Sequence, residues 1–222
     1  MANVSFTRDE AILALDTLMF SKKENLSSNS PAVSDLSHLL NELPIHPMEK
    51  RTANFRNPTG ISDQLRGFRY SLRPDNRLRV GSIFFAIYEE YRDHPEQIHA
   101  IAEAIRKNRD FFKTATFGSD LESDGFPEGA LLSHLHREVE TRDGRKIVPA
   151  ENCEICHLDL SAVYQPIPGD FLQCHLTVPV TELDGNKHYN ANDFITVCPN
   201  CHAVLHRHRP WATRDTASEI LF

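Results

Sequence analysis

The sequence predicts an α+β protein made of a mostly helical N-terminal domain and a smaller, zinc-stabilised C-terminal domain. Three observations support this prediction. Apolar residues recur at helical spacing through roughly the first half of the chain. Two Cys-x-x-Cys pairs lie near the C-terminus, and such pairs commonly hold zinc. Two short runs rich in apolar and β-branched residues accompany the cysteines and predict strands.

The composition is that of an ordinary globular protein. Of the 222 residues, 40% are hydrophobic and 25% are charged. No apolar run reaches the roughly 20 residues that a membrane-spanning helix needs, so no membrane partner is expected. The opening segment MANVSFTRDE lacks the basic and apolar regions of a secretory signal. Five cysteines without such a signal suit a reducing compartment, and we therefore expect a cytoplasmic protein.

Helix-start signals divide the N-terminal half. Thr7-Arg-Asp-Glu10 has the capping-box pattern and predicts that a first helix follows it. Pro31 is well placed to open a second helix, because proline fits the first helical position. After a turn at residues 57–60, Ser62 is expected to cap a third helix. Further helices are expected at residues 81–92, 95–109 and 128–140.

The third helix carries arginines on one face. Its apolar positions share one side, whereas Arg66, Arg69 and Arg73 share the other. These arginines belong to a stretch from Lys50 to Arg79 that has eight basic residues and only two acidic ones, although the formal net charge of the chain is −7. An acidic protein with a confined basic patch is typical of nucleic-acid binding. The alternative is an ordinary solvated surface.

Composition also separates the two halves. Residues 113–127 are poor in periodicity and rich in Gly, Ser, Thr and Asp, which is typical of a linker. We therefore expect a helical domain at residues 1–112, a linker with a lead-in helix at 113–150 and a C-terminal domain at 151–222. Within the C-terminal domain, strands are expected at residues 171–178 and 194–197, and a helix at 199–208.

The cysteines are the most specific chemical signal. The two-residue spacer of each pair lets both sulfur atoms point at one ion. The four expected zinc ligands are Cys153, Cys156, Cys198 and Cys201. Three histidines surround these cysteines in the sequence, namely His175, His202 and His206. On spacing alone a purely structural zinc site is an alternative, but the additional histidines indicate an enzyme.

The C-terminal motifs follow one another in a specific order: Cys153-Glu-Ile-Cys156, Gln173-Cys-His-Leu-Thr-Val-Pro179, Asp193-Phe-Ile-Thr-Val-Cys-Pro-Asn-Cys-His202 and His206-Arg207. This order resembles the signature of HNH endonucleases of the McrA-like restriction family, over roughly the last hundred residues. The resemblance implies a ββα-metal (HNH) fold. The helical region resembles, less closely, the DNA-recognition modules that precede such nucleases and often read modified cytosine.

The resemblance assigns roles to individual residues. It implies that His175, His202 and His206 bind one divalent ion, such as Mg²⁺, Mn²⁺, Co²⁺ or Ni²⁺, which supports phosphodiester hydrolysis. Asp193 takes the place of the family's central Asn and is expected to stabilise a loop. Leu176 stands where the family has the histidine that serves as general base. Since general-base catalysis contributes about 10²–10⁴-fold, we expect a DNA endonuclease whose cleavage is impaired in this chain.

The expected partner is double-stranded DNA, with methylated or hydroxymethylated cytosine as the modification to be read. The residues expected to contact DNA are Arg56, Arg66, Arg69, Arg73 and Arg207. Cutting both strands with one site per chain would favour a homodimer. Two alternatives stay open. One is a DNA-binding protein without cleavage, with Leu176 either natural or introduced, and the other is a zinc-structured interaction protein with no role in nucleic-acid binding.

Overall fold

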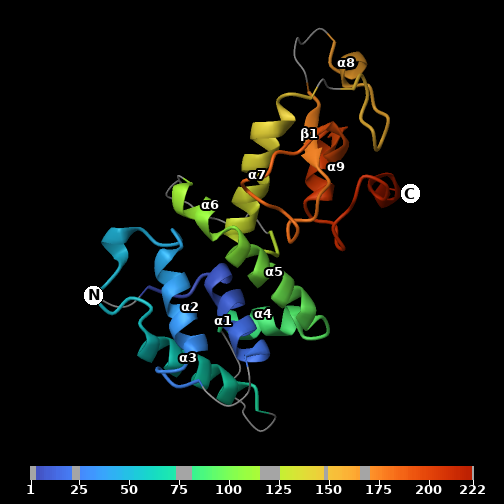
Figure 1. The fold of residues 1–222 in the computed structure, drawn as a ribbon. Coiled ribbons are helices and arrows are strands. Elements are labelled where there is room, and N and C mark those ends of the chain that lie inside the picture. Colours follow the sequence, from blue (N-terminus) through green and yellow to red (C-terminus); the bar gives the residue numbers. More distant parts are fainter. Residues whose placement is uncertain are drawn as a thin grey trace. The chain divides into compact units, whose positions relative to one another are not determined.

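The computed structural model describes residues 4–21, 26–73, 82–115, 126–147, 150–165 and 171–221 (Figure 1). The chain forms two compact units. The N-terminal unit comprises Met1–Glu122 with Gly129–Leu131, and the C-terminal unit comprises Ser123–Glu128 with Leu132–Phe222. Two arginines of the basic stretch, Arg77 and Arg79, lie outside the described residues, as does most of the expected linker.

The N-terminal unit is helical throughout its described part. Its elements are α1 (Arg8–Phe20), α2 (Pro31–Glu42), the 3-10 helix η1 (Met48–Lys50), α3 (Pro58–Ser71), α4 (Ile83–Tyr91), α5 (Pro95–Lys107) and α6 (Arg109–Thr114). Helix α1 contacts α2, α3, α4 and α5 and forms the centre of the unit (Figure 1). Ile12, Leu13 and Leu15 of α1 are fully buried, so this helix has the all-round apolar environment of a core helix.

Two of the three predicted helix starts are confirmed. Thr7 and Glu10 form the capping box before α1, and Pro31 occupies the first turn of α2. The predicted cap of the third helix is wrong. Asn57 caps α3 by accepting a hydrogen bond from the Gly60 N–H, and Pro58 opens the helix. Because α3 starts earlier, Ser62 lies inside it.

The C-terminal unit combines helices with a small sheet. Its elements are α7 (Ala130–Gly144, of which the first two residues belong to the N-terminal unit), α8 (Leu160–Val163), β1 (Gln173–Leu176), the 3-10 helix η2 (Ala191–Asp193), β2 (Phe194–Val197), α9 (Pro199–Leu205) and the 3-10 helix η3 (Ala217–Leu221). Strands β1 and β2 are antiparallel, with Gln173 opposite Val197 and Leu176 opposite Phe194. The second strand agrees with the prediction, whereas the first strand and the last helix are shorter than expected.

Helix α7 lies along the edge of β1 that β2 leaves open (Figure 1). The backbone N–H of Leu176 donates to Glu140 Oε1 at 3.0 Å, and His136 Nε2 donates to the Leu176 carbonyl at 3.2 Å. Two side chains of α7 thus form hydrogen bonds with the backbone N–H and carbonyl groups at the edge of the strand that also carries His175. The lead-in helix is therefore mostly a structural part of the C-terminal unit. Among the helices of the described segments, none is long and apolar enough to span a membrane.

Candidate metal centres

The four predicted zinc ligands come together in the C-terminal unit. The sulfur atoms of Cys153, Cys156, Cys198 and Cys201 all lie within 4.8 Å of one another. The Cys156 and Cys198 sulfur atoms are 3.8 Å apart. Four ligands about 2.3 Å from a tetrahedral zinc ion would be separated by about 3.8 Å. The four cysteines, which are not joined by disulfides, therefore have a geometry that can bind zinc.

Local structure explains why the cysteines converge. Cys198 is the N-cap of α9, and its sulfur atom accepts from the Cys201 N–H at 3.4 Å, so the first turn of the helix brings this pair together. The other pair lies in a turn that is held beside β2, because the Glu154 N–H donates to the Thr196 carbonyl at 2.9 Å. This turn and strand β2 lie in one buried cluster with Ile155, Val197 and Leu205.

The thiol environments also fit a cation. Burial raises the pKa of Cys153, but backbone N–H groups of Cys156, Cys198 and Ile155 outweigh it and bring that pKa down to about 7. Burial and the three neighbouring thiols raise the pKa of Cys201 far above its ordinary value. Four crowded sulfur atoms cannot all ionise without a positive charge between them, and zinc supplies that charge.

A second group of ligands joins the three predicted histidines to a carboxylate. One ligand atom from each of Glu140, His175, His202 and His206 lies within 4.8 Å of the others. We call these four residues the His/Glu cluster. Helix α7 supplies Glu140, β1 supplies His175, and His202 and His206 lie on α9 and at its C-cap. The predicted convergence of the histidines is confirmed, and Glu140 is an addition.

The distances within the His/Glu cluster fit a single ion. His202 Nε2 lies 2.9 Å from His206 Nε2, and Glu140 Oε1 lies 3.2 Å from His175 Nδ1 and 3.6 Å from His202 Nε2. Ligands about 2.0–2.2 Å from one ion would lie about 3–3.6 Å apart. His175 Nδ1 is buried and, within the described part of the chain, makes no hydrogen bond. A bound ion would satisfy this nitrogen.

The tautomer of His202 supports the same conclusion. Its Nδ1 lies 2.6 Å from Gln173 Oε1, a carbonyl oxygen that can only accept, so Nδ1 donates. In the neutral ring Nε2 is then a lone-pair acceptor, and it faces His206 Nε2. Anchoring one ring nitrogen while the other faces the ion is the usual arrangement of a metal-binding histidine.

Burial sets the charge of the His/Glu cluster. It lowers the pKa of His175 to about 4 and that of His206 to about 3, against the opposing influence of Glu140. Burial alone would raise the pKa of Glu140, but its close contacts with His136, His175 and His202 hold it well below 4.5. At neutral pH the cluster therefore offers the neutral imidazoles of His175 and His206 and an ionised carboxylate, which suit a divalent transition-type ion.

The position of Leu176 bears on the expected general base. Successive strand residues point to opposite faces of the sheet, and His175 points to the His/Glu cluster. Leu176 therefore points away from the cluster, and it is fully buried (0% exposed). A histidine at position 176 would lie in the core rather than beside the ion.

Asp193 has the loop-holding geometry expected of it. Its carboxylate accepts from the Asn190 N–H at 2.9 Å, and its carbonyl accepts from the backbone N–H and the side chain of Thr177, each at 2.9 Å. These bonds join the segment after β1 to the 3-10 turn before β2. Asp193 acts through the backbone and is not a member of the His/Glu cluster.

A cavity of about 250 Å³ opens onto the His/Glu cluster. Glu140, His202 and His206 line it, together with Phe126 and two arginines. Arg207 was expected to contact DNA; it is exposed and donates to the Ala203 carbonyl at 2.9 Å. Arg137 of α7 is also exposed. Two guanidinium groups beside a metal-binding cluster favour an anionic ligand, since guanidinium groups match phosphate oxygens.

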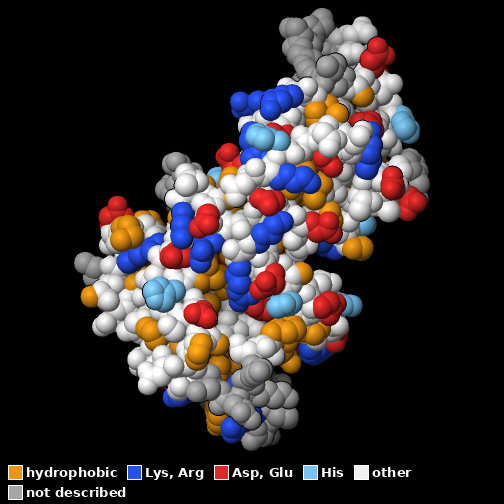
Figure 2. Space-filling view, viewed as in Figure 1, with side chains coloured by type: hydrophobic (Ala, Val, Ile, Leu, Met, Phe, Trp, Pro, Cys, Tyr) orange, Lys and Arg blue, Asp and Glu red, His pale blue; other side chains and the backbone are white. Residues whose placement is uncertain are grey.

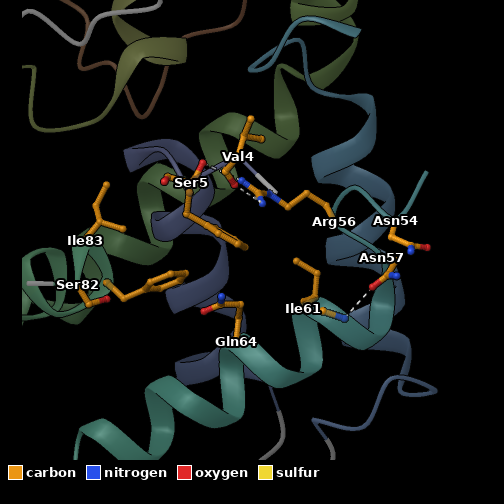
Figure 3. A pocket seen from close by; sticks show the side chains of 12 residues that line it. Val4, Ser5, Asn54, Arg56, Asn57, Ile61, Gln64, Ser82 and Ile83 are labelled. Carbon is orange, nitrogen blue, oxygen red and sulfur yellow. Dashed lines mark hydrogen bonds between the residues drawn. The ribbon is translucent and has the colours of Figure 1, made fainter. Parts of the chain in front are cut away.

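Arg56, in contrast, is not available for DNA. It is 7% exposed and pairs with Glu10 through two contacts of 2.6 and 2.9 Å. Its guanidinium group also donates to the carbonyls of Val4 and Ser5, each at 3.0 Å (Figure 3). Arg56 thus forms one wall of a cavity of about 540 Å³ in the N-terminal unit, which Gln64 of α3 also lines (Figure 3). Its donors hold the fold together, and the prediction for Arg56 is wrong.

The three arginines of the third helix stay candidates for DNA contact. Arg66 and Arg69 are exposed on α3, and Arg73 is exposed just after its end. At 100° per residue they lie on a different side of α3 from Gln64 and its cavity. On the face shown in Figure 2, Lys and Arg side chains are interspersed with Asp and Glu and form no continuous basic surface.

Three residues of the C-terminal site were missed by sequence reasoning: His136, Arg137 and Glu140. A signal for two of them was present, since His136 and Glu140 are four residues apart and share a helical face. A third group, Asp16 with His99 and Glu103, also has metal-ligand spacing in the N-terminal unit. Its buried carboxylate is already paired with Arg106 at 2.6 Å, so it is a weaker candidate.

Comparison with known proteins assigns neither a family nor a function to this chain. No protein-family model, no curated protein and no solved structure matches the chain. The two candidate metal centres must therefore be interpreted from their own chemistry.

Proposed function

We propose that the protein is a metal-dependent endonuclease that hydrolyses phosphodiester bonds in DNA. The observation that carries the proposal is the His/Glu cluster, whose four ligand atoms lie within 4.8 Å of one another. Three of its residues, Glu140, His202 and His206, line a cavity that also bears Arg137 and Arg207. A divalent ion held there would stabilise charge on the phosphate and on the leaving oxygen. The four-cysteine site would hold zinc and keep β2 and α9 in place.

The residues of the cavity suit the steps of hydrolysis. Arg137 and Arg207 would bind the phosphate oxygens and orient the bond to be cleaved. A divalent ion held by the cluster would also lower the pKa of the attacking water, which would activate it without an imidazole base at position 176. On this account the chain needs no further histidine for cleavage.

The N-terminal unit would bind the DNA duplex through Arg66, Arg69 and Arg73. Contacts to phosphates position a protein, whereas contacts to base edges specify a sequence or a modification. We propose that this unit directs cleavage to DNA with methylated or hydroxymethylated cytosine, as in modification-dependent restriction. Cleavage of both strands would then require two chains, one site for each strand.

The proposal is tested by nicking of supercoiled plasmid, unmodified or carrying methylated or hydroxymethylated cytosine, with Mg²⁺, Mn²⁺, Co²⁺ or Ni²⁺. We expect metal-dependent nicking of modified DNA that falls by 10²-fold or more in His202→Ala, within the range for loss of a catalytic group. His134→Ala is the matched control, because His134 pairs with Glu138 outside the cluster. Absence of nicking by the zinc-loaded protein with all four ions would refute cleavage.

The second candidate is a DNA-binding protein without cleavage. The observation that favours it is the fully buried His175, which is 1% exposed and therefore poorly placed to reach a water molecule on the substrate. Salt-dependent binding of modified DNA without nicking would support this candidate. Absence of DNA binding would instead support an interaction protein stabilised by zinc.

A further inference from the structure

We propose that His136 is a positioning residue that fixes the Glu140 carboxylate for the ion of the His/Glu cluster. This inference rests on the metal site of the proposed function. His136 lies one helical turn before Glu140 on α7, is fully buried (0% exposed) and does not belong to the group of four ligands.

His136 contacts both the helix and the strand that carry ligands. Its Nε2 donates to the Leu176 carbonyl at 3.2 Å, directly after His175 in β1. Its Nδ1 lies 3.4 Å from Glu140 Oε1, a distance of ion-pair range, and makes no hydrogen bond within the described part of the chain. One imidazole thus sets the separation between α7 and β1 at the level of the cluster. Any shift of the ring would move Glu140 relative to His175.

The surroundings of Glu140 show why its orientation needs support. Leu176 N–H, His175 Nδ1 and His136 Nδ1 lie 3.0, 3.2 and 3.4 Å from the same oxygen, Oε1. Oε1 also lies 3.6 Å from His202 Nε2, so it is the carboxylate oxygen that faces the histidines of the cluster. Since Glu140 lines the cavity, these contacts would hold in place the oxygen that faces the ion.

Packing fixes the ring of His136. Its centroid lies 5.1 Å from that of His206, 5.2 Å from Trp211 and 6.3 Å from Phe126. A ring enclosed in this way cannot change rotamer without moving its neighbours. Partners of metal ligands that are held like this commonly contribute 10–100-fold to metal affinity.

The test is cobalt binding in the absence of DNA. The full-length protein is first loaded with one equivalent of Zn²⁺ to fill the cysteine site, and Co²⁺ is then titrated while its d–d absorption is recorded. Absence of thiolate-to-cobalt charge-transfer absorption shows that the cysteines keep their zinc. We expect His136→Ala to weaken Co²⁺ binding 10–100-fold and to change the d–d spectrum, because the ligand geometry changes.

Two further variants separate positioning from folding. His134→Ala removes the histidine of the similar i,i+4 pair with Glu138 on α7, and we expect wild-type Co²⁺ binding from it. His136→Gln keeps a donor for the Leu176 carbonyl but loses the ring nitrogen that faces Glu140. We expect this variant to stay folded and to bind Co²⁺ more weakly than wild type. If His136→Ala fails to fold, Co²⁺ binding by His136→Gln decides whether His136 positions Glu140.

The cobalt titration distinguishes failure of the inference about His136 from failure of the proposed metal site. If folded His136→Ala or His136→Gln binds Co²⁺ with wild-type affinity and an unchanged spectrum, His136 does not position Glu140. That result would not contradict the metal site itself. Failure of the wild-type protein to bind any Co²⁺ beyond its zinc would overturn the metal site, and with it both this inference and the proposed function.

Discussion

Glu10 and Arg56 form a buried ion pair between the start of α1 and the turn before α3, with N–O distances of 2.6 and 2.9 Å. The Glu10 side chain is 0% exposed and that of Arg56 is 5% exposed. His46 Nε2 lies 3.0 Å from the same carboxylate. A residue that the basic pattern assigned to DNA therefore joins two elements of the N-terminal unit, and the pair predicts how stability depends on pH.

We expect Glu10→Gln to lower the free energy of unfolding by about 3–5 kcal/mol at pH 7, because it leaves the buried Arg56 charge uncompensated. Burial raises the pKa of Glu10, but hydrogen bonds from His46 and Arg56 outweigh it and hold the pKa below 4.5. The stabilisation is therefore present above pH 4.5 and is lost as the pH falls through the folded-state pKa. Urea unfolding between pH 7 and 3 measures the difference, which should shrink on acidification.

The control for this pair is Glu103→Gln, which removes a carboxylate that is 57% exposed and paired with Arg106 on the surface. Its effect should stay below about 1 kcal/mol. A Glu10→Gln variant as stable as this control would show that the buried pair contributes nothing.

Loss of zinc should unfold the cysteine site. We expect Cys201→Ser to lose its tightly bound Zn²⁺ and to lower the melting temperature, since a structural zinc ion contributes folding free energy directly. Metal content by mass spectrometry and thermal unfolding measure both effects. Cys174→Ser is the matched control, because Cys174 lies on β1 outside the group of four cysteines. Equal zinc content in the two variants would contradict the assignment.

Leu176→His should destabilise the protein without improving cleavage. The side chain is fully buried and points away from the His/Glu cluster, so an imidazole there would lose apolar packing and leave polar atoms without partners. We expect a loss of about 2–4 kcal/mol and no gain in nicking rate. Chemical denaturation and the plasmid assay measure the two quantities. A variant that is as stable as wild type and cleaves faster would show that position 176 reaches the ion.

The fluorescence of Trp211 should report metal binding. Trp211 is the one tryptophan of the sequence, and its ring lies 6.1 Å from that of His175 at an interplanar angle of 24°. We expect Co²⁺ added to the zinc-loaded protein to quench this fluorescence and to saturate at one ion per chain. His175→Ala should abolish the saturable quenching, whereas His134→Ala should leave it intact. Equal quenching in all three proteins would place the Co²⁺ elsewhere.

The arginines of α3 should control the salt dependence of DNA binding. For each phosphate contact removed, the slope of log K against log salt should become shallower by about 0.9. We therefore expect Arg66→Ala and Arg69→Ala each to weaken binding and reduce the slope by roughly one contact. Arg92→Ala, which removes a half-exposed arginine of another surface ion pair, is the control. Unchanged slopes in the α3 variants would exclude this helix from the DNA interface.

The metal ligands show what local sequence could predict. The cysteine pairs and the spacing of His202 and His206 depend on one turn and one helical face, and geometry within a few residues fixes both. The strand at residues 194–197 and the capping box of α1 were predictable for the same reason.

The tertiary structure decided the rest. Glu140 joins His175 only because α7 packs along the edge of β1, a contact between residues 35 positions apart in the sequence. Arg56 is buried by a carboxylate 46 residues away, and no local pattern distinguishes it from the exposed Arg66. The side of the sheet on which the Leu176 side chain lies follows from the pairing of two short strands. The sequence by itself determined which ligand types are present and their local spacing, whereas long-range packing decided which side chains meet, because burial and contact depend on parts of the chain that local periodicity does not relate.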